Sequence, residues 1–176
     1  GAFGFGISRN VRDCYRFLVE NYELGDELYL LGFSRGAFTA RSLAGLVRNS
    51  GVLRQQHLAR SPDAYRLYRA RRATTKPRGI EAQLFRRMHS HPDQDPMVHF
   101  IGVWDTVGSL GIPLDGLGLG RLINGRWGFH DTDLSSRVRY AYQALAIDEE
   151  RRPFRPTPWT LGSEPAEQTL EQVWFS

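Results

Sequence analysis

Residues 28–47 have the sequence Leu-Tyr-Leu-Leu-Gly-Phe-Ser-Arg-Gly-Ala-Phe-Thr-Ala-Arg-Ser-Leu-Ala-Gly-Leu-Val, which combines an apolar run, a glycine-bounded turn and an amphipathic segment. The apolar run at residues 28–31 is typical of a buried parallel strand. The segment after the turn has apolar residues at helical spacing. We therefore expect a strand at 28–33, a tight turn, and a helix at 36–48.

The turn, Gly32-Phe33-Ser34-Arg35-Gly36, matches the pattern G-x-S-x-G, which forms a nucleophile elbow when a strand precedes it and a helix follows. The serine of such an elbow has a strained backbone that lifts its hydroxyl above the sheet edge. We expect Gly32 and Gly36 to be required because a Cβ atom at either position would strike the neighbouring strand or helix. The helix dipole and the backbone N–H of Arg35 would stabilise an oxyanion beside Ser34. The alternative is an ordinary strand–helix turn.

Length and composition favour a single domain over residues 1–176. The net charge of +4 is carried almost entirely by arginine, since Lys76 is the only lysine, and this excess is too small to indicate nucleic-acid binding. No run of 18 apolar residues and no signal peptide are present, so we expect a cytoplasmic protein. The lone Cys14 excludes an internal disulfide and a cysteine zinc site, and we expect it in the core.

The remaining elements follow from local patterns. We expect residues 1–6 to form a loop. The predicted helices run from Asn10 to about Gly25, from Ser61-Pro62-Asp63 onward, over 80–88, and from Asp133 or Ser135 to about Ile147. The predicted strands are 97–104 and one that begins near Gln172. Alternation of helices and apolar strands indicates an α/β fold with a parallel sheet. The long glycine-rich segment 106–133 is expected to be a lid or binding loop, and arginines 66, 69, 71 and 72 could attract anionic lipid.

A serine hydroxyl needs a histidine base, which in turn needs a carboxylate to orient it. Asp105 directly follows the predicted strand 97–104, at the edge where catalytic groups of α/β sheets gather. Asp148 is the rival acid, although it follows a predicted helix. Both candidates remain open at this point.

The base is harder to assign. In α/β-hydrolases the chain order is serine, acid, histidine. His57, His89, His91 and His99 all precede Asp105, and the fifth histidine, His130, lies in the glycine-rich segment. The residues alone therefore identify a nucleophile, and His130, beside Asp131, is the one histidine of this chain that follows Asp105 and could be the base.

Four blocks of sequence bear on the question of the missing base. They are Gly-Phe-Ser-Arg-Gly-Ala-Phe-Thr-Ala-Arg at 32–41, Phe-Ile-Gly-Val-Trp-Asp-Thr-Val-Gly at 100–108, Ala-Leu-Ala-Ile-Asp-Glu-Glu-Arg-Arg at 144–152 and Gln-Val-Trp-Phe at 172–175. Together they resemble an α/β-hydrolase family that includes the catalytic domains of type VI secretion phospholipase effectors. The resemblance covers nearly the whole chain. It implies an α/β-hydrolase core, with a mostly parallel sheet flanked by helices.

The resemblance also implies a chemistry. The expected activity is a serine esterase acting on lipid esters, first of all a phospholipase, with Ser34 as nucleophile, Asp105 or Asp148 as acid and the N–H of Arg35 as oxyanion donor. No metal or organic cofactor is needed. The expected partners are a lipid or other ester, an anionic membrane and components of a secretion system, which would deliver the protein to another cell or the periplasm.

In this family the Trp-Phe strand leads into a Val-His-Ser-Asp-Val-Gly-Gly segment with the catalytic histidine, and an Asp-Gly-Thr strand precedes the region of Gly1. Both lie outside the present chain, so we expect a domain truncated at both ends and inactive by itself. An esterase on a soluble substrate and a non-catalytic interaction module with a hydrolase fold remain the alternatives.

Overall fold

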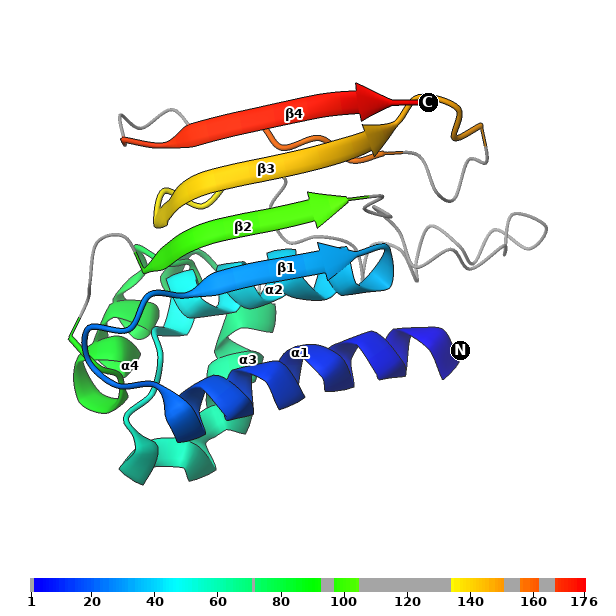
Figure 1. Ribbon diagram of the computed structural model, residues 1–176. Helices are drawn as coiled ribbons and strands as arrows, with labels where there is room; N and C mark the ends of the chain where they lie inside the picture. Colours follow the sequence, from blue (N-terminus) through cyan, green and yellow to red (C-terminus); the bar gives the residue numbers. More distant parts are fainter. Residues whose placement is uncertain (1, 71, 93–96, 105–133, 151–155, 162–166) are drawn as a thin grey trace.

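The computed structural model describes the chain except for residues 1, 71, 93–96, 105–133, 151–155 and 162–166 (Figure 1). The described elements, in chain order, are α1 (Ala2–Asn21), β1 (Tyr29–Phe33), α2 (Arg35–Ser50), the 3-10 helix η1 (Gln55–Arg60), α3 (Ser61–Arg69), the 3-10 helix η2 (Ala73–Thr75), α4 (Ile80–His89), β2 (Val98–Trp104), β3 (Val138–Ala146) and β4 (Thr169–Phe175). The predicted segment 106–133 lies outside the described residues.

The four strands form one sheet in the order β1-β2-β3-β4, and all neighbouring pairs are parallel. The register pairs Phe33 with Trp104, Trp104 with Ala144, and Ala144 with Val173, so the carboxyl ends of all four strands lie along one edge. The predicted α/β class with a parallel sheet is confirmed, and the bounds predicted for β1 and β2 differ from the observed ones by one residue.

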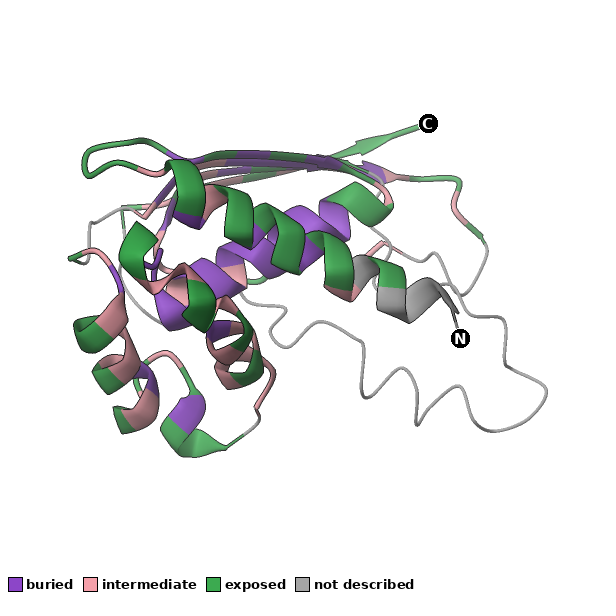
Figure 2. Ribbon diagram, turned by 90° about the horizontal axis from the view of Figure 1, so that it is seen from below, coloured by how far each residue is buried: buried purple, intermediate pink, exposed green. Residues whose placement is uncertain are grey.

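The described helices lie on one side of this sheet (Figure 1). Helix α2 packs directly against β1 and β2 and is buried along most of its length, with α1 and α3 on its outer side. Figure 2 views the sheet edge-on, with the described helices on one side of it, and shows the buried residues concentrated along α2. Leu46 and Val47 of α2, together with Ile101 and Val103 of β2, are at most 2% exposed and form the centre of the core.

Helix α1 differs from its prediction in length and in orientation. It begins at Ala2, so the expected loop at 1–6 is wrong. Its buried face consists of Val11, Tyr15 and Val19, at a spacing of four residues, and the Tyr15 hydroxyl donates a hydrogen bond to the carbonyl of Gly51 (2.7 Å). Cys14 is therefore exposed rather than in the core, because the face is rotated by one residue toward the larger tyrosine.

Helices α3 and α4 begin close to the predicted positions, and polar bonds tie them to the end of α2. The Ser50 hydroxyl donates to the carbonyl of Ala64 (3.1 Å), and the Ser90 hydroxyl donates to the carbonyl of Ser50 (2.6 Å). The Asn49 amide donates to the carbonyl of Thr75 (2.8 Å). The carbonyls of Ser50 and Thr75 lie at helix ends, where intrahelical partners are missing, and these side-chain donors satisfy them.

The helix predicted between Asp133 and Ile147 is wrong, because residues 138–146 form strand β3. The apolar residues Val138, Ala141, Tyr142 and Leu145 fit helical spacing, but in the sheet Ala141 and Leu145 are buried on one face while Tyr142 is exposed on the other. β3 pairs with a strand on each side, so its backbone hydrogen-bonding groups are satisfied by neighbours that local periodicity does not reveal. Tertiary pairing outweighs the local preference here.

Candidate active site

Ser34 lies at the junction between β1 and α2, as the sequence predicts. Its backbone angles are φ 52° and ψ −114°, and it is the one non-glycine residue with positive φ among the described residues. This conformation is strained for an L-amino acid, and strained residues cluster at functional sites. The predicted position and the predicted unfavourable backbone are both confirmed.

The surrounding hydrogen bonds fix the backbone of Ser34 and leave its side chain out of the helix cap. The Ser34 N–H donates to the carbonyl of Trp104 (3.0 Å), and the Ser34 carbonyl accepts from the N–H of Phe38 (3.2 Å). A serine at an N-cap position usually has an extended backbone and accepts a bond from the helix with its hydroxyl. Ser34 makes no such side-chain cap bond, so its hydroxyl is not used in capping the helix.

The two glycines of the turn have different roles. A Cβ atom on Gly32 would lie 2.4 Å from the carbonyl oxygen of Gly36 and 2.6 Å from the nitrogen of Ala37, so the expected steric requirement is confirmed there. A Cβ atom on Gly36 would meet no described atom within 4 Å, so the expectation is wrong for Gly36. The start of α2 crosses over Gly32 at the end of β1, so there is no room for a side chain at Gly32. Gly36, on the first turn of α2, is exposed and has free space around it.

Arg35 is the first residue of α2, and Arg35 and Gly36 are exposed. The first N–H groups of an α-helix have no intrahelical acceptor, and the helix dipole makes this end electropositive. A negatively charged oxygen beside Ser34 would therefore meet backbone donors. The Arg35 carbonyl already accepts a bond from the Thr39 hydroxyl (3.0 Å), which keeps the first turn of α2 rigid.

The two candidate acids follow neighbouring strands. Asp105 lies outside the described residues, but it follows Trp104, whose carbonyl accepts the Ser34 N–H. Asp148 is exposed and follows strand β3, not the helix that the sequence predicted. Since the strands are parallel, the end of β3 lies at the same edge as Ser34, one strand beyond β2. The objection to Asp148 from secondary structure is thereby removed.

Three of the described histidines lie at the far end of α2. His57 is in η1 and His89 ends α4; the N–H of Arg54 donates to the carbonyl of His89 (3.0 Å), and the N–H of His91 donates to that of Val52 (2.9 Å). These contacts follow the last residue of a 16-residue helix that starts beside Ser34, a length of about 24 Å. None of the three can reach Ser34.

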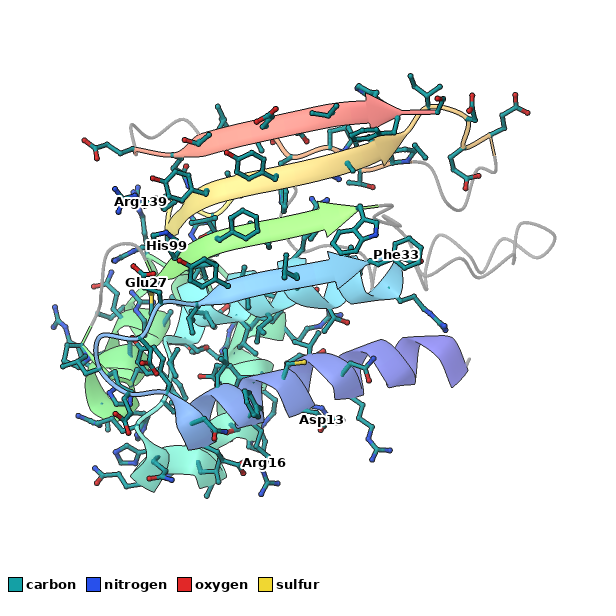
Figure 3. The ribbon with its side chains drawn as sticks, in the orientation of Figure 1. Asp13, Arg16, Glu27, Phe33, His99 and Arg139 are labelled. Carbon is teal, nitrogen blue, oxygen red and sulfur yellow. The ribbon has the colours of Figure 1, made fainter. Side chains whose placement is uncertain are left out.

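His99 lies at the start of β2, at the edge of the sheet opposite Ser34. Its Nδ1 is 3.3 Å from a carboxylate oxygen of Glu27, and its ring contacts those of Tyr29 and Tyr140 (centroids 5.1 and 5.4 Å). Figure 3 shows His99 and Glu27 together at one end of the strands and Phe33 at the other. No histidine that the structure describes is therefore placed to act on Ser34, and His130 lies outside the described residues.

Two further expectations concern metals and membranes. The described residues contain no group of three or more His, Cys, Asp or Glu side chains that could hold a metal ion, and no described helix is long and apolar enough to span a bilayer. Part of the arginine cluster is paired: Arg66 contacts Asp63, and Arg72 contacts Glu81 at 2.8 Å. Pairing lowers the charge available for anionic lipid, so that contact remains a prediction.

Sequence reasoning missed a buried polar cluster near Ser34. Arg41 of α2 is only 6% exposed, Gln143 of β3 is 2% exposed, and both donate to the carbonyl of Thr157. The signal available in the sequence was an arginine on the buried side of the helix that follows Ser34.

The comparisons with known proteins agree with this geometry. A sequence model of the family described as "T6SS, Phospholipase effector Tle1-like, catalytic domain" matches residues 1–176. The chain is 30% identical over 163 residues to the uncharacterized protein YEL023C of Saccharomyces cerevisiae. The aligned region covers 90% of this chain and 22% of the yeast protein. The chain thus spans about a fifth of that relative's length, and no solved structure matches it significantly. The chain therefore belongs to the Tle1-like phospholipase effector family of type VI secretion, and it matches the part of that family described as the catalytic domain.

Proposed function

We propose that this domain is a serine hydrolase that cleaves carboxylic esters of lipids, with Ser34 as its nucleophile. The observation that carries the proposal is the backbone of Ser34, which is strained while its hydroxyl does not cap the helix that it precedes. Such strain costs roughly 1–3 kcal/mol and is kept where it serves a purpose. A serine needed only to start α2 would have an ordinary extended backbone and a capping hydroxyl.

The proposed reaction is an acyl transfer through Ser34. A histidine base removes the proton from the Ser34 hydroxyl as its oxygen attacks the ester carbonyl carbon. The carbonyl oxygen becomes an oxyanion, to which the N–H of Arg35 donates at the electropositive end of α2. The intermediate then expels the alcohol, which takes the proton from the imidazolium. Water, activated by the same base, releases the carboxylic acid and restores Ser34.

Asp105 is our first choice as the acid that orients the base, because Trp104 before it pairs with the residue before Ser34. Asp148 is the second choice, since it also follows a parallel strand at this edge. The two are separable by substitution. Loss of the true acid should lower kcat by roughly 10⁴-fold, and loss of the other should have a much smaller effect.

The base is proposed to lie beyond Ser176, at the carboxyl end of β4, as the family resemblance implies. The described histidines support this assignment because each lies far from Ser34. The substrate is proposed to be a phospholipid, in keeping with the family description. Peripheral contact with anionic membrane and delivery by a secretion system are proposed on the same basis.

The experiment uses a protein extended beyond Ser176 through the family's Val-His-Ser-Asp segment and upstream through its Asp-Gly-Thr strand. We expect it to hydrolyse phospholipid in mixed micelles and to be labelled by a fluorophosphonate probe. Ser34→Ala should abolish both, whereas the control Ser8→Ala on α1 should not change either. The 176-residue chain alone should be inactive.

Four outcomes would contradict the proposal or a part of it. Activity that survives Ser34→Ala would exclude the nucleophile, and activity of the short chain that His130→Ala removes would exclude a base beyond Ser176. An extended protein that folds but neither reacts with the probe nor hydrolyses any ester would favour an interaction module. Faster cleavage of a soluble ester than of micellar lipid would favour an esterase on a soluble substrate.

A further inference from the structure

A short segment between β3 and β4 crosses the helix-covered face of the sheet beside α2 (Figure 1, orange). It includes Thr157, Trp159 and Thr160, and Trp159 is only 6% exposed. The carbonyl of Thr160 accepts the N–H of Leu134 (2.8 Å), which precedes β3. Trp159 therefore anchors the segment in the packed interior, while Pro158, Thr160 and Leu161 beside it are exposed.

Two glutamines hold this segment against the strands. Gln143 of β3 and Gln172 of β4 are paired in the register of the sheet. The Gln172 amide makes a reciprocal pair of bonds with Trp159, accepting its N–H (2.8 Å) and donating to its carbonyl (3.1 Å). The Gln143 amide donates to the carbonyl of Thr157 (3.2 Å). Both strands are thus bonded to the segment that crosses them.

Arg41 of α2 joins the same segment from the other side. One of its terminal nitrogens donates to the Thr157 carbonyl (2.6 Å), and its guanidinium lies over the Trp159 ring, 4.5 Å from the centroid. Burial lowers the pKa of Arg41 to about 10. Burying a guanidinium is costly, and a long apolar side chain would fill this position at less expense. We call Arg41, Gln143, Thr157, Trp159 and Gln172 the crossover cluster.

Along the strands, the crossover cluster lies close to the edge of the sheet where Ser34 is found. Gly32, Val103, Gln143 and Gln172 form one row across the four strands. This row lies two residues before Ser34 along the strand direction. Gly32 in the row is the residue over which α2 begins, and Arg41 lies two helical turns beyond Ser34 on the same helix. The helix that carries Ser34 is therefore tied to β3 and β4 just below their carboxyl ends.

We propose that Arg41 is a positioning residue, which sets the distance between Ser34 and the groups that follow β3 and β4. The inference rests on the proposed function, because the acid Asp148 or the base beyond Ser176 must come from those strand ends. Direct sheet pairing does not fix this distance, since β2 and β3 separate β1 from β4. The crossover cluster spans that gap with a single rigid, planar side chain.

The test compares three substitutions in the extended protein described above. Arg41→Met keeps the length of the side chain and removes its charge and hydrogen bonds. Arg41→Lys keeps the charge but not the planar donor that lies over Trp159. Arg48→Met, two turns further along α2, is the matched control. The measurements are kcat and KM on micellar phospholipid, the rate of fluorophosphonate labelling, and hydrogen exchange of the Trp159 amide.

We expect Arg41→Met to lower kcat and the labelling rate by about 100-fold with KM within twofold, because a misplacement of about 1 Å costs this much. Exchange at Trp159 should accelerate, Arg41→Lys should lie between wild type and Arg41→Met, and Arg48→Met should match wild type. Gln172→Met, which removes the bonds from the β4 side, should lower kcat in the same way. If Arg41→Met does not fold, Gln172→Met decides by the same criteria.

Two results would overturn the inference. If exchange at Trp159 accelerates while kcat stays within threefold of wild type, the crossover cluster has only a structural role. If exchange at Trp159 does not change, Arg41 does not hold the segment. Failure of the proposed function is recognised separately, because Ser34→Ala would then retain activity. A protein in which Ser34→Ala is inactive but Arg41→Met is fully active contradicts the positioning role alone.

Discussion

The two faces of the sheet are built from similar residues but have different environments. The helix-covered face presents Leu30, Ile101, Val103 and Leu145, each at most 8% exposed. The opposite face carries large apolar side chains that no described element covers, and their exposed fractions reach 67% at Leu31. The residues of this open face that are most exposed are Tyr29, Leu31, Phe33, Trp104, Val173 and Phe175.

Side chains of the open face pack against one another. The rings of Tyr29, Phe100 and Tyr142 stack across three strands, with centroids 6.2 and 5.6 Å apart. The Phe100 ring packs over Gly102, so this position favours a glycine: a Cβ atom there would lie 2.8 Å from the ring. Nearly continuous apolar strands are typical of parallel sheets covered on both faces. A hydrophobic pattern therefore predicts that a face of a sheet is buried, but it does not identify the residues that bury it.

The largest expected difference between the faces concerns two glycines. Gly32→Ala should cost more than about 4 kcal/mol and prevent stable folding, because the new Cβ would strike the backbone of Gly36 and Ala37. Gly102→Ala should cost about 1 kcal/mol, because the exposed ends of Phe100 and Leu31 can move aside. Urea unfolding followed by circular dichroism measures both. Equal losses would mean that the open face is as tightly packed as the other.

Two leucines, one on each side of the sheet, should differ in their contribution to stability. Leu46→Ala in α2 should lower the free energy of unfolding by about 2–5 kcal/mol, because Leu46 is fully buried and a cavity would remain. Leu31→Ala on the open face should change it by about 0.5 kcal/mol or less. The same urea titrations report both values. A loss above 2 kcal/mol at Leu31 would show that the open face is covered in solution.

Alkaline pH should affect Tyr15, which is buried in the helical layer, differently from Tyr29 on the open face. Burial raises the pKa of Tyr15 far above its usual value of 10, whereas the pKa of Tyr29 is raised chiefly by the bond that its hydroxyl donates to Glu27. The unfolded state ionises Tyr15 near pH 10 and the folded state does not, so stability falls as pH rises above 10. Tyr15→Phe should remove this part of the loss between pH 9 and pH 11. At pH 7 it should cost about 1 kcal/mol for the bond to Gly51.

Absorbance at 295 nm checks the tyrosine prediction, since it follows the ionisation of each group. Tyr29 should titrate while the circular dichroism signal is still native, and Tyr15 should titrate only with unfolding. An unchanged slope of stability against pH in Tyr15→Phe would contradict the assignment.

The smallest effect is expected on the outer surface of the helices. Glu81→Gln removes an exposed ion pair with Arg72 (2.8 Å), and it should cost about 0.5 kcal/mol or less. The difference should disappear in 1 M salt, which screens exposed charges. Unfolding at both salt concentrations measures it. A larger, salt-independent loss would mean that the helical layer is stabilised through its outer surface as well as its core.

Local sequence was sufficient for the features that depend on neighbouring residues. The turn at 32–36 has its glycines and serine within five positions, and Pro62 marks the first turn of α3, so both elements were predicted at nearly their observed positions. The strained backbone of Ser34 was predicted for the same reason, because its cause is the immediate strand-to-helix reversal. Apolar runs also identified β1 and β2.

Features that depend on distant partners were decided only by the tertiary structure. Residues 138–146 became a strand because β2 and β4 supply hydrogen bonds on both sides, which no local period records. That change also placed Asp148 after a strand end, at the edge of the sheet where Ser34 lies, and not at a helix end. The crossover cluster joins Arg41 to Thr157 across 116 positions, so its contacts exist only once the sheet has formed. Gly36 looked equivalent to Gly32, yet only the packing of α2 over β1 shows which of the two must lack a side chain.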